Sequence, residues 1–135
     1  MDPPAPETMM RALETLIYLT AIDEEGDLTE MGKHMAEFPI DPLVAHCVLR
    51  SVEFECSSQM LTVAAMLSVQ NCFVRSGGSE FRADKAKRSL SHPDGDHLTL
   101  LQVYEAFLEQ GRDKAWCNEK FLNPRSLEAA IKIRA

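Results

Sequence analysis

The sequence lacks most of the features that would mark it as an enzyme, a secreted protein or a membrane protein. It contains no phosphate-binding loop of the form G-x-x-x-x-G-K-[ST] and no G-x-S-x-G nucleophile elbow. No apolar run approaches the roughly 20 residues that cross a bilayer, and the N-terminus carries no signal-peptide pattern. We therefore predict an intracellular chain with no catalytic residue, no cofactor-binding residue and no membrane contact of its own.

Cysteine is scarce and poorly spaced for metal binding. The four cysteines form no C-x-x-C pair, which argues against a zinc knuckle, and without a secretion signal a disulfide framework is not expected: Cys47, Cys56, Cys72 and Cys117. The segment from His92 to His97 places two histidines and two aspartates within six residues. Its central residues are typical of a turn, and Asp96 is placed to cap the next helix. We predict no metal site.

Positive charge is also in deficit, with 21 acidic residues against 14 lysines and arginines and a net charge of −7. An excess of acidic residues disfavours nonspecific binding of nucleic acid, which depends on clustered cations. One local basic stretch nevertheless runs from Arg75 to Arg88. If residues 80–90 form a helix, Arg82, Lys85 and the pair Lys87–Arg88 form a partly continuous basic face. This face is either simply solvated or contacts the phosphates of a single-stranded nucleic acid, with Asn71 or Phe73 touching bases.

The most informative stretch that is present runs from Met60 to Val69, where only Thr62 and Ser68 interrupt the apolar residues. A helix without a polar face must be covered on all sides, so this segment predicts a central buried helix. Further helices are indicated over residues 6–21, 30–38, 42–52, 80–90, 96–110, 113–122 and 124–135, from their apolar spacing and from start and stop residues. A tight hairpin or a bare loop is expected at Ile22–Leu28. The predicted fold is mainly all-α, with six or seven helices.

Several blocks of the chain resemble one family along its whole length. The blocks are MDPPAPETMMRALETLIYLTAIDEEGDLTEMGKHMAEFPIDP, AAMLSVQNCFVR, HPDGDHLTLLQVY and WCNEKFLN. In this order and spacing they resemble the helicase-associated region of DEAH-box ATP-dependent RNA helicases, most closely the branch that acts in pre-mRNA splicing and ribosome biogenesis. The resemblance implies a partial winged helix with a possible small β-hairpin at residues 1–53. A ratchet-like helical bundle would follow at residues 54–135, and we expect this bundle to continue beyond Ala135.

The resemblance also implies partners and cofactors. ATP and magnesium would bind the RecA-like motor domains of the parent protein, which would be an ATP hydrolase, whereas this segment would be inactive alone. Expected partners are single-stranded RNA, the motor and OB-fold domains of the same protein, and a G-patch activator or spliceosomal proteins. The expected location is the nucleus, with the cytoplasm as an alternative.

Family RNA contacts lie near the end of the helix that corresponds to the buried segment. Carried over to this sequence, they imply RNA binding by Ser68, Asn71 and Arg75, to which the basic stretch adds Arg82, Lys85 and Arg88. The family usually has proline where this chain has Gln70 and Ser76, so the turn that aims Arg75 differs here. Two functions follow as hypotheses. The chain either helps to form the RNA channel and couples motor movement to RNA translocation, or it is chiefly a scaffold for docking proteins.

Overall fold

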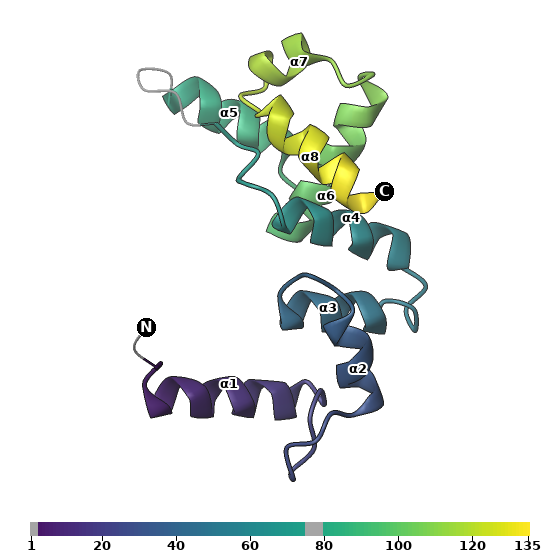
Figure 1. Cartoon of the computed structure of the whole chain (residues 1–135). Coiled ribbons are helices and arrows are strands. Elements are labelled where there is room, and N and C mark those ends of the chain that lie inside the picture. Colours follow the sequence, from purple (N-terminus) through teal and green to yellow (C-terminus); the bar gives the residue numbers. More distant parts are fainter. Residues whose placement is uncertain (1–2, 75–79) are drawn as a thin grey trace. The chain divides into compact units, whose positions relative to one another are not determined.

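The computed structural model describes residues 3–74 and 80–135, and it confirms a mainly all-α fold (Figure 1). Eight helices lie in these residues: α1 (Pro6–Tyr18), α2 (Glu30–Ala36), α3 (Pro42–Arg50), α4 (Ser57–Leu67), α5 (Glu80–Leu90), α6 (Asp96–Glu109), α7 (Lys114–Glu119) and α8 (Pro124–Arg134). Each of the eight predicted ranges contains or overlaps one of these helices, so the predicted total of six or seven was too low. None of the described helices has the length and apolar content of a bilayer-spanning segment.

The chain divides into two compact units, Met1–Ser57 and Ser58–Ala135. In the first unit, Pro6 occupies the first turn of α1 and Glu7 adds a negative charge there, both of which favour a helix start. The small core of this unit consists of Leu19, Ala21, Met35 and Ala45, with partly buried neighbours around it. The apolar spacing over residues 6–21 correctly predicted a helix, but α1 itself has no buried residue, and its Leu16 is only partly buried against this core. A unit of this size has too little chain to cover every apolar face.

A closed turn links α1 to α2, as one of the two alternatives predicted. Ile22 and Leu28 form an isolated antiparallel bridge, and the Asp23 carboxylate accepts a hydrogen bond from the Asp27 amide at 2.8 Å. Thr29 then begins α2, because its hydroxyl oxygen accepts from the Gly32 amide at 3.0 Å. The same hydroxyl donates to the Thr20 carbonyl at 2.6 Å, which fastens the start of α2 to the end of α1. The turn is therefore closed by one isolated bridge and by side-chain hydrogen bonds, without a strand on either side in the described residues.

Gly32 marks a close approach between two backbone segments of this unit. A Cβ atom built on Gly32 would lie 1.9 Å from the Ala21 carbonyl oxygen and 2.8 Å from its carbonyl carbon. Both are backbone atoms, so no rotation of a side chain could relieve the clash. Glycine is thus required here because the first turn of α2 packs directly against the chain leaving α1.

In the second unit, every helix from α4 to α8 contributes to the apolar core, and α4, α6 and α8 each supply two or more of its buried residues. The central part of α4, Thr62–Met66, is buried on all sides as predicted. The helix ends two residues before the apolar run does, however, and Leu61 and Leu67 on either side of the buried part are 40% and 42% exposed. The largest side chains that are fully enclosed come from elsewhere: Val103 and Phe107 on α6, Leu122 before α8, and Leu127 on α8. The core around α4 is therefore filled mainly by side chains from other parts of the unit.

Polar contacts also hold α8 against the start of α4. The buried Thr62 hydroxyl donates to the Ser58 carbonyl at 3.1 Å and accepts from the Arg134 guanidinium at 2.8 Å. A second guanidinium nitrogen of Arg134 donates to the Ser58 hydroxyl at 3.0 Å. A buried hydroxyl without partners would cost about 1–3 kcal/mol. Arg134 thus satisfies Thr62 and joins the two helices.

The turn before α6 corrects one sequence-based assignment. Asp96 does not cap this helix; it is the first helical residue, and Gly95 with φ 129° occupies the capping position without a side-chain hydrogen bond. The His92 amide donates to the Thr99 hydroxyl at 2.8 Å, and the Asp94 amide donates to His92 Nδ1 at 3.2 Å. These bonds assign the His92–His97 segment a structural role in closing the turn.

Four residues other than glycine in the described part of the chain have a positive φ, each in a turn that follows a helix. Thr20 follows α1, Glu55 lies beyond α3, Arg112 follows α6 and Phe121 follows α7, with φ between 55° and 62°. This left-handed region is costly for residues with a Cβ atom. Backbone hydrogen bonds close each of these turns, as in the 2.9 Å bond from the Arg112 amide to the Phe107 carbonyl.

We predict that Gly32→Ala destabilises the first unit by about 3 kcal/mol, the upper end of the range for overpacking, because its methyl group would overlap the Ala21 carbonyl. Urea denaturation followed by circular dichroism measures the change. Lys33→Ala, at the adjacent exposed position on the same helix, is the control and should leave the midpoint almost unchanged. Equal midpoints for both variants would contradict the close approach.

A second prediction concerns the thiols. Burial raises the pKa of the Cys72 thiol to about 11, although the charge of Lys87 acts in the opposite direction. Burial also raises the pKa of Cys117, and the charges of Asp113 and Glu128 add to the effect. Because the thiolate is the reactive form, a chromogenic disulfide reagent at about pH 8 should label exposed Cys47 rapidly and leave Cys72 and Cys117 unmodified until denaturant is added. Fast labelling of all four thiols in the native chain would refute this.

Candidate nucleic-acid interface

The candidate interface begins where α4 ends. The Ser68 amide and hydroxyl both donate to the Ala64 carbonyl, at 3.1 and 2.8 Å. The Asn71 carboxamide oxygen accepts from the Phe73 amide at 3.0 Å, which forms a tight polar turn. Both side chains are exposed. Ser68 therefore retains acceptor capacity and Asn71 retains its NH₂ donors, so each could still bind a ligand while serving the local structure.

The segment after this turn pairs with the chain between α7 and α8. Phe73 and Leu122 form an isolated antiparallel bridge. The Val74 amide donates to the Phe121 carbonyl at 2.8 Å, and the Asn123 amide donates to the Cys72 carbonyl at 2.7 Å. Cys72 and Leu122 are both buried in the core of the second unit. We call this pairing the exit bridge; it fixes the backbone on either side of Phe73.

Asn123 connects the exit bridge to α8. Its side-chain oxygen accepts from the Arg125 amide at 3.0 Å and so caps the start of that helix. The pairing of residues 72–74 with 121–123 is the feature of the candidate interface that the sequence did not predict. A bridge this short leaves no alternating strand pattern, and the only signal was the presence of both segments among the blocks that resemble the family.

Lys87 on α5 lies over Phe73. Its Nζ is 5.2 Å from the centroid of the Phe73 ring, within the range of a cation–π contact. Phe73 itself is partly buried and packs against the core. A cation, an aromatic ring and the exposed amide of Asn71 are thereby brought together at the end of α4.

The remaining cations of α5 lie on a different side of that helix. Ala83, Ala86 and Leu90 are its least exposed residues and define its inward face at a spacing of i, i+3 and i+7. Arg82, Lys85 and Arg88 are exposed, and their i, i+3 and i+6 spacing places them together on a basic face, as predicted. Lys87 does not extend that face, which corrects one part of the prediction. In the parts of the chain that the structure describes, no carboxylate lies within ion-pair distance of Arg82, Lys85 or Arg88.

The structure describes five of the six residues that are predicted to contact RNA. Ser68 and Asn71 lie at the end of α4, and Arg82, Lys85 and Arg88 lie along α5. Arg75 and Ser76 fall outside the described residues. RNA binding by each of these residues stays a prediction. Among the described residues, no group of three side chains is arranged to hold a metal ion.

Comparison with known proteins places the chain in a family. Residues 12–40 match the winged-helix part of the helicase-associated domain (HA2), and residues 41–100 match its ratchet-like part. The chain is 48% identical to the human protein described as "ATP-dependent RNA helicase homolog DQX1" and 48% identical to its mouse counterpart. These matches cover 99% and 100% of this chain but only 18% and 19% of the two relatives.

The boundary between the two parts differs with the criterion. The two family matches meet between residues 40 and 41, so that α3 falls in the ratchet-like part. The compact units instead divide after Ser57, which leaves α3 with α2. The predicted division between residues 53 and 54 lies between these positions and stays a prediction. Taken together, the helical fold, the two adjoining family matches and the 48% identity show that the chain belongs to the helicase-associated region, winged-helix and ratchet-like, of the DEAH-type RNA helicases.

Proposed function

We propose that this chain helps to form the single-stranded RNA channel of a DEAH-box helicase and couples movement of the motor domains to RNA translocation. The observation that supports this most is the contact between Lys87 and Phe73 beside the exit bridge. It joins an aromatic ring to a cation at the place where a rigid, buried helix ends. Single-stranded nucleic acid is commonly bound by such combinations of aromatic and basic side chains.

The rigidity of the exit bridge supports the coupling part of the proposal. Because the bridge ties the end of α4 to the start of α8, a displacement applied to either helix would be transmitted to Phe73. The proposal assigns RNA binding to Ser68, Asn71, Arg75, Arg82, Lys85 and Arg88. It assigns ATP hydrolysis, with ATP and magnesium, to motor domains of the parent protein, and it places that protein in the nucleus, in splicing or ribosome biogenesis.

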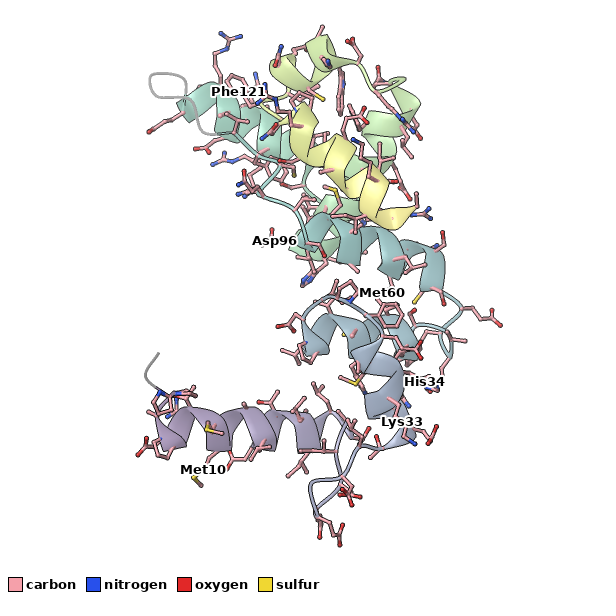
Figure 2. The ribbon with its side chains drawn as sticks, viewed as in Figure 1. Met10, Lys33, His34, Met60, Asp96 and Phe121 are labelled. Carbon is pink, nitrogen blue, oxygen red and sulfur yellow. The ribbon has the colours of Figure 1, made fainter. Side chains whose placement is uncertain are left out.

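A second candidate function is protein docking, and α1 favours it. Leu13 is 50% exposed and Ile17 is 42% exposed, and the neighbouring methionines on this face are exposed as well. Figure 2 shows Met10 projecting away from the ribbon of α1. An apolar face of this kind would suit an amphipathic partner segment, such as that of a G-patch activator or a spliceosomal protein.

The RNA proposal predicts salt-sensitive binding. In fluorescence anisotropy, a labelled single-stranded RNA should bind the chain more weakly as salt is raised, because counterions are released from its phosphates. Lys87→Ala should weaken binding several-fold by removing a cation at Phe73. Lys33→Ala, which removes a lysine that pairs with Glu30 on α2, is the matched control and should not. Equal affinities for these two variants would remove the Phe73 contact from the proposal.

The coupling proposal is tested in the full-length helicase. Arg75→Glu should lower RNA-stimulated ATP hydrolysis and unwinding by reversing a charge that the family resemblance places against RNA. Thermal unfolding of the variant is measured in parallel, and an unchanged midpoint assigns the loss to RNA binding. Unwinding at the unsubstituted rate would exclude Arg75 from the mechanism.

The docking candidate makes its own prediction. Leu13→Glu combined with Ile17→Glu should abolish capture of a G-patch peptide while leaving RNA affinity unchanged, because it places two charges on the apolar face of α1. Thr15→Glu, on the polar side of the same helix, is the control. If the unsubstituted chain recovers no peptide, the docking candidate fails.

A further inference from the structure

One exposed aromatic side chain has no role in the fold or in the interface described above. Phe81, in the first turn of α5, is 82% exposed. The apolar residues that attach α5 to the rest of the unit are Ala83, Ala86 and Leu90, on the opposite side of the helix. Phe81 therefore contributes almost nothing to the core, and leaving a phenylalanine ring in water has a cost of about 1.5–3 kcal/mol relative to burying it.

The neighbours of Phe81 on the helix surface are cations. Lys85 and Arg88 follow it at i+4 and i+7, the spacing that aligns side chains on one face of a helix. With a rise of about 1.5 Å per residue they lie about 6 and 10 Å further along the helix axis. Arg82 flanks this row on one side, and Asp84 flanks it on the other. The row offers a ring followed by two positive charges, even though the chain as a whole carries a net charge of −7.

We infer that Phe81 stacks on a base of single-stranded RNA while Lys85 and Arg88 bind the phosphates next to it. This inference rests on the proposed function and adds a base-contacting residue to it. Every base presents a flat π-face to an aromatic ring, and a single strand exposes that face together with its phosphates. Acidic side chains of a peptide would also satisfy the two cations, but only a nucleic acid carries a flat ring beside every negative charge as part of its repeating unit.

Phe81 is better suited to stacking than Phe73. One side of the Phe73 ring lies under Lys87, and the residue is partly buried in the core. Phe81 is open to solvent over most of its surface. A base can therefore reach the Phe81 ring without displacing any protein group, whereas Phe73 serves to position Lys87.

The test compares two labelled strands of 12 nucleotides, oligoadenylate and an abasic ribose-phosphate strand, by anisotropy. Phe81→Ala should weaken binding of oligoadenylate about tenfold and leave the abasic strand unchanged, since only the first strand can stack. Lys85→Ala and Arg88→Ala should weaken both strands, and each should lower the salt slope by roughly 0.7. Phe54→Ala, which removes a ring that is 73% exposed between Glu53 and Glu55, is the matched control and should change neither strand.

The outcomes separate this inference from the proposed function. If the unsubstituted chain binds neither strand, RNA binding by the chain and stacking by Phe81 both fail. If it binds oligoadenylate but Phe81→Ala binds equally well, only the stacking role is overturned; an equal loss on both strands overturns it too. Phe81→Trp gives an independent reading, because tryptophan fluorescence at this position should be quenched by oligoadenylate, beyond any change seen from Trp116 in the unsubstituted chain.

Discussion

Two backbone hydrogen bonds, from Val74 to Phe121 and from Asn123 to Cys72, fix the arrangement on which the second unit depends. They bring together segments that are far apart in the sequence, one following α4 and the other preceding α8. Cys72 and Leu122 are buried in the core beneath the pairing, which shields its inner side from water. A hydrogen bond that is protected in this way is expensive to break without a replacement. The exit bridge therefore determines where Phe73 lies and, through Lys87, what α5 can contribute beside it.

Local signals were sufficient to predict most of the helices. Pro42 and Pro124 begin α3 and α8, and the side chains of Asp41 and Asn123 cap those helices. The features that could not be predicted from the sequence depend on contacts with backbone atoms elsewhere in the chain. Gly32 is required because of the Ala21 carbonyl, and the exit bridge joins single residues without a strand pattern. The mistaken cap at Asp96 has a different cause, because Gly95 can adopt a positive φ that moves the helix start one residue earlier than its side chains suggest.

The candidate interface was predictable to the extent that helical spacing determines it. The common face of Arg82, Lys85 and Arg88 follows from their positions once α5 is a helix. The orientation of Lys87 did not follow, since it depends on a ring held by the exit bridge. The local hydrogen bonds of Ser68 and Asn71 could not be foreseen from the family resemblance, which concerns only their contacts with RNA. The net negative charge was a poor guide to any of this, because an average over the chain conceals where the cations gather.

The four non-glycine residues with a positive φ in the turns after helices lower the stability of the folded chain. Thr20, Glu55, Arg112 and Phe121 each keep a backbone conformation that costs a residue with a Cβ atom about 1 kcal/mol. Several of these ends lead into hydrogen-bonded connections, including the turn after α1 and the exit bridge after α7. These conformations lower the free energy of unfolding of the chain, and they set the direction in which its connections leave the helices. Replacement of exposed Thr20, Glu55 or Arg112 by glycine or asparagine would recover part of that energy without altering the packing of either core.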